Sequence, residues 1–276
     1  MTVIKPAASS ALELAYEQFG DGSPVVVLHG LFGSSTNWRR IARALSDRHR
    51  VFTVDLRNHG NSPWAATMAY AEMAEDVVAL FDRLDLQKPD VLGHSMGGKV
   101  AMTLALTGPQ RLGRLVVVDI APISYGDHFS SYTQAMRGID TVAATSRDEV
   151  QRALSQDIHD PGTVGFLMQN LVRHNEQYDW RINLPALSAA MTEIGAFPSA
   201  LDGKTFSGPT TLITAARSDY VSADDRKLFS NYFPKARFVE IRDAGHWVHV
   251  DRPDEFIVAV REALGDPASM ENSAKP

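Results

Sequence analysis

The stretch DVLGHSMGGKVAMTLAL at residues 90–106 decides the fold, because it has the pattern of a strand, a sharp turn and a helix in direct succession. The pentapeptide GHSMG at residues 93–97 is a G-x-S-x-G pattern, which average composition alone would produce in roughly a tenth of chains this long. The context is more specific, since a short apolar run precedes the pattern and a helix is predicted over residues 96–106, ended by Gly108. This arrangement predicts a nucleophile elbow that carries Ser95.

Two other segments fit the loops that such a serine requires. HGLFG at residues 29–33 directly follows a predicted strand, in the position of the loop that donates a second backbone N–H to an oxyanion hole. We therefore predict Leu31 and Met96 as the two donors, although a plain glycine turn before a helix explains the first segment equally well when it is considered alone. His246 follows the last predicted strand and precedes the final helix, which predicts it as the general base.

Apolar runs and amphipathic stretches alternate along the chain. Continuous apolar runs are typical of strands buried on both faces, as in a mostly parallel sheet flanked by helices, so the predicted class is α/β. The predicted strands are residues 24–28, 51–54, 90–92, 115–118, 211–214 and 238–241. The predicted helices include residues 38–45, 71–84, 100–106 and 253–264.

A long insertion interrupts this alternation. About ninety residues separate Asp119 from the next predicted strand, whereas such connections usually take about 2–6 residues beyond their helix. The insertion contains helical signals: a capping box at Ser146, an Asp-Pro start at Asp160 followed by apolar residues at helical spacing up to Val172, and a third apolar pattern up to Ile194. We predict a core at residues 1–121 and 206–266, a helical cap at residues 122–205 and a flexible tail at residues 267–276.

Composition excludes several classes of function. The 276 residues carry a net charge of −6, which gives no basic footprint for nucleic acid or an anionic membrane. Cysteine is absent, so there is no disulfide, thiolate nucleophile or cysteine metal site, which is consistent with a cytoplasmic protein. No apolar run approaches the roughly 20 residues of a membrane span, the N-terminal residues lack the pattern of a secretory signal, and the histidines show no metal-ligand spacing.

Five motifs in order give the chain a family resemblance. They are LHGLFGSSTNW at residues 28–38, DLRNHGNS at 55–62, LGHSMGGKVAM at 92–102, VVVDIAP at 116–122 and AGHWVH at 244–249. Over roughly residues 12–264 the chain resembles the YbfF-type carboxylesterases of the α/β-hydrolase superfamily. The resemblance implies an α/β-hydrolase fold and its catalytic machinery, and it is weaker in the cap. It also implies esterase or thioesterase activity on small to medium acyl substrates, with no metal and no organic cofactor.

The acid of the triad departs from the usual pattern. Most α/β-hydrolases carry it after the seventh strand, but Ser218 occupies that position and Asp219 lies one residue later. YbfF-type esterases are similar there, and the resemblance places the acid after strand six, at Asp119. A one-residue shift turns a side chain to the opposite side, so we expect Asp219 to point away and Ser218 to be an auxiliary neighbour. The alternative is that Asp119 only caps a loop.

These residues predict acyl transfer in which Ser95 attacks, His246 accepts its proton and Asp119 orients the imidazole. A carbon–carbon bond hydrolase or a cofactor-free perhydrolase would use the same triad, and a ligand receptor without turnover could keep the fold. The sequence leaves the acyl group and the oligomeric state open. Five side chains are candidates for an acyl pocket, with core packing as the alternative: Tyr125, Phe129, Phe166, Met168 and Trp247.

Overall fold

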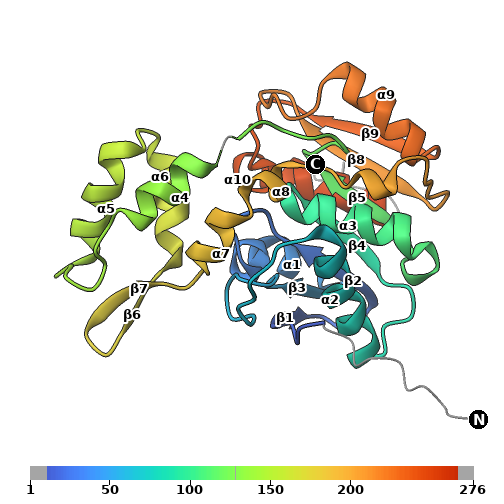
Figure 1. Cartoon of the computed structure of the whole chain (residues 1–276). Helices are drawn as coiled ribbons and strands as arrows, with labels where there is room; N and C mark the ends of the chain where they lie inside the picture. The colour runs from blue at the N-terminus through green and yellow to red at the C-terminus, as the bar shows by residue number, and fades with distance from the viewer. Residues whose placement is uncertain (1–10, 128, 267–276) are drawn as a thin grey trace, which may run out of the picture.

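A seven-stranded sheet lies between two layers of helices in the computed structural model, which describes residues 11–127 and 129–266 (Figure 1). The strand order is β1-β3-β2-β4-β5-β8-β9, and all neighbours are parallel except β1 and β3. The strands are β1 (Tyr16–Phe19), β2 (Ser23–Leu28), β3 (His49–Val54), β4 (Asp90–His94), β5 (Leu115–Val118), β8 (Thr210–Ala215) and β9 (Ala236–Ile241). The predicted mostly parallel sheet flanked by helices is confirmed.

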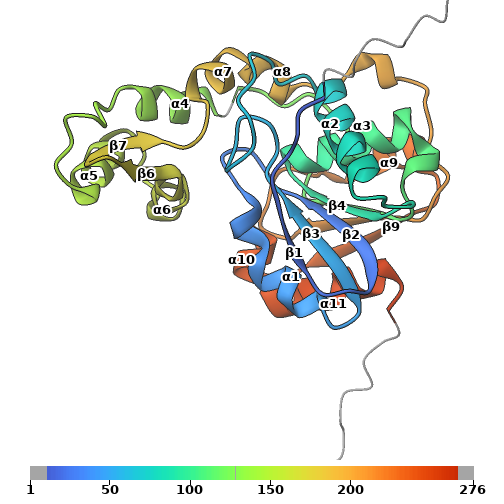
Figure 2. The same cartoon turned by 90° about the horizontal axis from the view of Figure 1, so that it is seen from below.

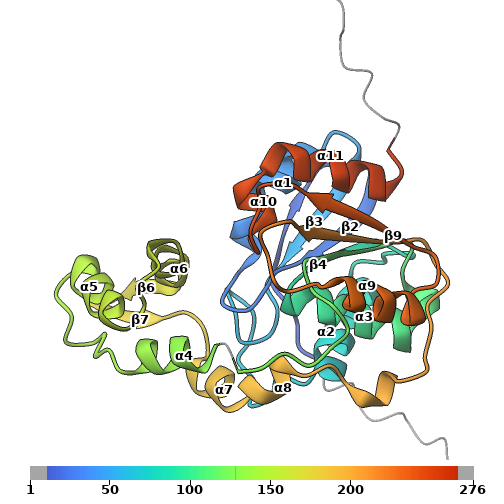
Figure 3. The ribbon, with the colours of Figure 1, turned by 90° about the horizontal axis from the view of Figure 1, so that it is seen from above.

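Helices cover both faces of this sheet, as Figures 2 and 3 show from opposite sides. One face carries α1 (Arg39–Leu45) and α11 (Pro253–Leu264), and the other carries α2 (Tyr70–Arg83), α3 (Met96–Thr107) and α9 (Ala223–Tyr232). In β2, Val25 and Val27 pack into the first layer, whereas Val26 and Leu28 pack into the second. The period of two residues thus buries apolar side chains on both faces, which explains the continuous apolar runs.

The remaining short elements lie in the connections between the longer helices and strands. They are α10 (Val248–Asp251) and the 3-10 turns η1 (Ser35–Trp38), η2 (Pro109–Arg111), η3 (Met168–Asn170) and η4 (Ser199–Leu201). Because β2, β4, β5 and β8 are parallel, their carboxyl ends meet at one edge of the sheet, where open α/β sheets place their ligands.

Most of the segment between β5 and β8, residues 130–180, stands to one side of the sheet in Figure 1. The whole segment contains α4 (Ser130–Arg137), α5 (Arg147–Asp157), α6 (Pro161–Leu167), β6 (Leu171–His174), β7 (Gln177–Trp180), α7 (Leu184–Ala189) and α8 (Met191–Gly195). The hydrogen bonds that tie it to the rest of the chain include Asn170 Nδ2 to the Phe32 carbonyl at 2.8 Å, Asn183 Nδ2 to Asn58 Oδ1 at 3.0 Å, and Tyr70 OH to the Ile194 carbonyl at 2.6 Å. The segment is thereby held beside the carboxyl ends of the strands.

Two sequence expectations need correction. The helix that begins after Asp160 does not reach Val172, because α6 ends at Leu167 and Val172 belongs to an antiparallel hairpin of β6 and β7. Its two-residue turn, Asn175 and Glu176, has φ values of 45° and 73°, the backbone that tight hairpin loops favour. The edge strand β1 was also not expected, since its four residues alternate in burial instead of forming an apolar run.

Some expectations are not tested by the structure. The tail at residues 267–276 lies outside the described residues, and the boundaries of core and cap remain a prediction. Within the described ranges, none of the helices combines the length and the apolar character that crossing a bilayer requires.

Candidate active site

Ser95 lies at the sharp turn between β4 and α3, with φ 53° and ψ −120°. A Cβ atom on Gly97 would lie 2.5 Å from the carbonyl oxygens of both Leu28 and His29, and a Cβ atom on Gly93 would collide with Gly97. The glycines at both ends of the GHSMG pattern are therefore required by close backbone approach, which is the geometry of a nucleophile elbow. Ser95 lines a cavity at the strand ends.

Asp119 and His246 form a hydrogen-bonded pair near this serine. Oδ2 of Asp119, at the end of β5, lies 2.8 Å from Nδ1 of His246, and the carboxylate is 1% exposed. Its other oxygen accepts a hydrogen bond from the Ala215 N–H at 3.1 Å, and the Ser218 hydroxyl donates to Oδ2. The exposed residue Asp219 has no hydrogen bond to His246. Since Nδ1 is held by Asp119, Nε2 is the ring nitrogen that remains for chemistry.

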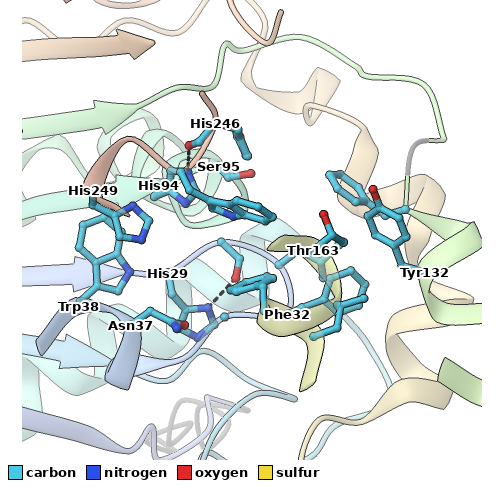
Figure 4. Close-up of a pocket in the computed structure, with 17 residues that line it drawn as sticks. His29, Phe32, Asn37, Trp38, His94, Ser95, Tyr132, Thr163, His246 and His249 are labelled. Atoms are coloured by element: carbon cyan, nitrogen blue, oxygen red, sulfur yellow. Dashed lines mark hydrogen bonds between the residues drawn. The ribbon is translucent and has the colours of Figure 1, made fainter. Parts of the chain in front are cut away.

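Two further side chains support His246. The Tyr220 ring stacks on its imidazole with centroids 3.9 Å apart. His94 Nε2 donates to the His246 backbone carbonyl at 2.8 Å, as Figure 4 shows. Burial, and then the neighbouring imidazoles of His246 and His249, lower the pKa of His94 well below its usual value. His94 is therefore a neutral donor. In the sequence, Tyr220 carries no signal beyond its place two residues after Ser218.

Two buried histidines hold the loop after β2. The Leu56 N–H donates to His29 Nε2 at 3.0 Å, so His29 Nδ1 carries the proton that bonds the Gly30 carbonyl at 2.8 Å. His59 Nε2 accepts from the Phe32 N–H at 3.2 Å, and burial lowers the pKa of His59 to about 3. The backbone on both sides of Leu31 is thus fixed by neutral imidazoles.

The two predicted oxyanion donors border the serine. Leu31, Met96 and Ser95 line one small cavity together, and within residues 11–127 and 129–266 neither the Leu31 nor the Met96 N–H donates to a protein acceptor. Met96 is the first residue of α3, where the free N–H groups and the helix dipole give a positive potential. An anion that developed beside Ser95 would find two unpaired donors.

The cavity that Ser95 and His246 share has a volume of about 60 Å³ and is lined from both parts of the chain (Figure 4). The sheet loops contribute Ser95 and His246, whereas the inserted segment contributes Phe129, Tyr132, Thr163, Phe166 and Leu167. Of the predicted pocket residues, Phe129, Phe166 and Trp247 line this cavity and Tyr125 lines the smaller one; Met168 is instead buried in the core. Among the described residues no cluster of His, Asp and Glu is arranged to bind a metal ion.

This fold and site define a class of protein. The family model described as alpha/beta hydrolase fold matches residues 23–253, so the chain belongs to the α/β-hydrolase family. The sn-1-specific diacylglycerol lipase ABHD11 of Danio rerio is 40% identical over 263 residues, which cover 91% of this chain and 82% of that protein. Esterase YbfF of Escherichia coli is 35% identical over 249 residues, which cover 89% and 94%.

A solved structure of an esterase is also similar to this chain in fold and sequence. A marine microorganism esterase matches with a TM-score of 0.89 and 35% identity, and the match covers 91% of this chain and 99% of that one. The predicted relationship to the YbfF-type esterases is confirmed.

Proposed function

We propose that this protein is a serine hydrolase that cleaves carboxylic esters or thioesters of small to medium acyl groups through an acyl-enzyme. The observation that carries the proposal is the 2.8 Å hydrogen bond between Asp119 and His246, beside a strained Ser95 that lines the same cavity as the imidazole. The names of the relatives, diacylglycerol lipase and esterase, favour ester bonds over the carbon–carbon and perhydrolase alternatives.

The residues divide the reaction between them. Asp119 fixes the His246 tautomer and stabilises the imidazolium, so Nε2 can accept the proton of Ser95 as its hydroxyl attacks the acyl carbon. The Leu31 and Met96 N–H groups stabilise the oxyanion. His246 then protonates the leaving alcohol or thiol, and water attacks the acyl-enzyme with the same histidine as base. Ser218 shares the Asp119 carboxylate as an auxiliary hydrogen-bond donor.

The inserted segment completes the proposal. We assign residues 122–205 as a cap whose aromatic side chains bound the acyl group, which favours small molecules over folded proteins as substrates. The proposed mechanism uses no metal and no organic cofactor. A cytoplasmic location stays a prediction that rests on the absence of cysteine.

Kinetics on purified protein test this function. We expect turnover of p-nitrophenyl acetate, butyrate and octanoate and of a matched butyryl thioester, and labelling of the parent by a fluorophosphonate probe. The Ser95→Ala variant is the control and should neither turn over nor be labelled. Thermal stabilisation by these compounds without turnover would instead identify a receptor on the same fold.

A further inference from the structure

Tyr220 lies flat against the proposed general base. Its ring and the His246 imidazole have centroids 3.9 Å apart and planes inclined by 17°, so the face of the phenol covers the face of the imidazole. The proposed mechanism uses the two nitrogens of this imidazole, at its edge, and assigns no task to the contact on its face.

The backbone of Tyr220 is held by groups of the site itself. Its N–H donates to Ser218 Oγ at 3.3 Å, and the Ser218 hydroxyl donates in turn to the Asp119 carboxylate. The Tyr220 carbonyl accepts from the Tyr125 hydroxyl at 2.7 Å, and this hydroxyl accepts from the Ala121 N–H at 2.8 Å. The loop after β8 is thus tied to the triad acid and to the segment that follows β5, which fixes the ring over the imidazole.

The contact between the two rings changes during the reaction. An aromatic face is the negative side of the ring quadrupole and attracts a cation. Burial raises the pKa of Tyr220 to about 12, so its ring is a neutral phenol at neutral pH. His246 is a neutral base before the reaction and becomes an imidazolium when it accepts the Ser95 proton. The attraction therefore grows toward the transition state, which is where an interaction raises kcat.

The other titratable groups around His246 do not compete for this role. Asp119 holds Nδ1 at the edge of the ring. His94, with its ring centroid 4.7 Å away, and His249 in α10 are neutral, because burial lowers the pKa of His249 to about 3 and that of His94 well below its usual value. Two further titratable groups line the shared cavity, namely His29 and Tyr132.

One cation nearby titrates in the neutral range. Lys99 lines the second, smaller cavity beside Ser95, and burial lowers the pKa of Lys99 to about 7. Its Nζ lies 4.8 Å from the ring centroid of Tyr125. Because Lys99 is the same in every protein compared below, a difference among them reports on position 220.

We infer that Tyr220 is a positioning residue whose ring face stabilises the imidazolium form of His246 and thereby speeds the attack of Ser95. The proton moves from Ser95 Oγ to His246 Nε2 as the bond to the acyl carbon forms, and it passes to the leaving oxygen or sulfur as that bond breaks. Tyr220 exchanges no proton. This inference rests on the proposed function, because the imidazolium is that of the acyl transfer.

Two substitutions test the role of the ring. Tyr220→Leu removes the aromatic face, and Tyr220→Phe keeps it. A cation on an aromatic face is stabilised by an amount that corresponds to about twofold to thirtyfold. For ethyl butyrate, a slow ester, we expect Tyr220→Leu to lower kcat/KM by this factor on the high-pH plateau. The midpoint of its acidic limb should move down by about 0.4 to 1.5 pH units, and Tyr220→Phe should stay close to the parent in both.

The shape of the pH profile separates this role from simple packing. Below the midpoint His246 is protonated before the reaction begins, so the ring stabilises the starting state and the transition state alike. The profiles of the parent and of Tyr220→Leu should therefore converge at low pH. A loss by the same factor at every pH, with an unmoved midpoint, would assign Tyr220 to loop packing alone and overturn the inference.

A fluorinated ring tests the same point without removing the side chain. Replacement of Tyr220 by 3,4,5-trifluorophenylalanine keeps nearly the shape of Tyr220→Phe and weakens the negative ring face. We expect its plateau and its midpoint to fall between those of Tyr220→Phe and Tyr220→Leu, at an unchanged Tm. Identical profiles for the phenylalanine and trifluorophenylalanine proteins would overturn the inference, and this pair decides the question if Tyr220→Leu does not fold.

The outcomes distinguish the inference from the function on which it rests. A parent that is labelled by fluorophosphonate and hydrolyses ethyl butyrate, with a profile that the ring does not change, loses the positioning role and keeps the esterase proposal. A parent that is neither labelled nor active overturns the proposed function, and the inference with it.

Discussion

The loops at the strand ends and the inserted segment contribute to the same cavity in different ways. In the loops, polar side chains are buried and paired: Asp119 accepts three hydrogen bonds, and His94 donates to the loop that carries His246. The inserted segment lines the cavity mainly with aromatic and aliphatic carbon, and the hydroxyl of its lining residue Thr163 donates to Asp160 in its own helix cap. We therefore expect substitutions in the loops to change mainly kcat, and substitutions in the insertion, which shapes the cavity, to change mainly KM.

The largest expected change in kcat comes from a substitution in the loops at the strand ends. Ser95→Ala should lower kcat by about a millionfold, as loss of the nucleophile does in other triads. Steady-state kinetics and fluorophosphonate labelling measure it, and an unchanged Tm shows that the fold persists. Labelling that survives in this variant would place the nucleophile elsewhere and remove the contrast between the two regions.

Substitution of the proposed triad acid, Asp119, should give the next largest change in kcat. Asp119→Asn should lower kcat by about ten-thousandfold, because the amide cannot hold the required His246 tautomer. Asp219→Asn, one residue from the conventional position and exposed, should lose less than about tenfold, and Ser218→Ala should fall between the two. An inactive Asp219→Asn beside an active Asp119→Asn would assign the acid to the loop after β8.

The pH dependence of the free energy of unfolding distinguishes buried from exposed histidines. Burial lowers the pKa of His249 to about 3, so between this value and about 6.5 the unfolded chain binds a proton that the folded chain does not. The contribution of His249 is complete above pH 6.5 and is lost as the pH falls toward 3. At pH 5 the loss is about 2 kcal/mol.

Urea unfolding at pH 7 and pH 5 measures this contribution. His249→Phe keeps an aromatic ring against Trp38, on which His249 stacks at 4.3 Å, and should reduce the stability difference between the two pH values by about 2 kcal/mol. The control is His174→Phe in the inserted segment, where the side chain is exposed and the difference should stay that of the parent. Equal effects of the two substitutions would contradict the contrast in burial.

The smallest effect tests the insertion. Phe166 lines the cavity and its ring lies 5.2 Å from that of Trp247, so Phe166→Ala should raise KM for an octanoyl ester about tenfold with little change in kcat. Val142→Ala, at a position 59% exposed in the same segment, is the matched control and should stay within about twofold. A loss confined to kcat would mean that the insertion takes part in the chemistry.

Sequence reasoning predicted the sheet better than the insertion. The six apolar runs correspond to β2, β3, β4, β5, β8 and β9, because burial on both faces leaves an unbroken apolar signal. In the insertion, Leu171 and Val172 fit a helical spacing as well as a strand, and only the two-residue turn at Asn175 selects the hairpin. Short amphipathic elements are thus ambiguous in sequence.

The candidate site shows the same limit. Ser95, Asp119 and His246 follow strands whose ends must meet, so their proximity could be expected from the order of the motifs. The stacking of Tyr220 on His246 and the position of Lys99 beside the second cavity depend on loop conformation and on how the insertion returns. Neither feature leaves a periodic pattern of apolar residues in the sequence from which it could be predicted.

The left-handed backbone at Ser95 lowers the stability of the fold, although the side chain at this position is needed for activity. With φ 53° and ψ −120°, a side chain there costs on the order of 1–3 kcal/mol that glycine would not incur. Ser95→Gly should therefore give a protein that melts at a higher temperature than the parent and has lost its nucleophile. Selection for thermal stability alone would favour glycine at this position. The serine at this turn is therefore explained by its role in catalysis and not by stability.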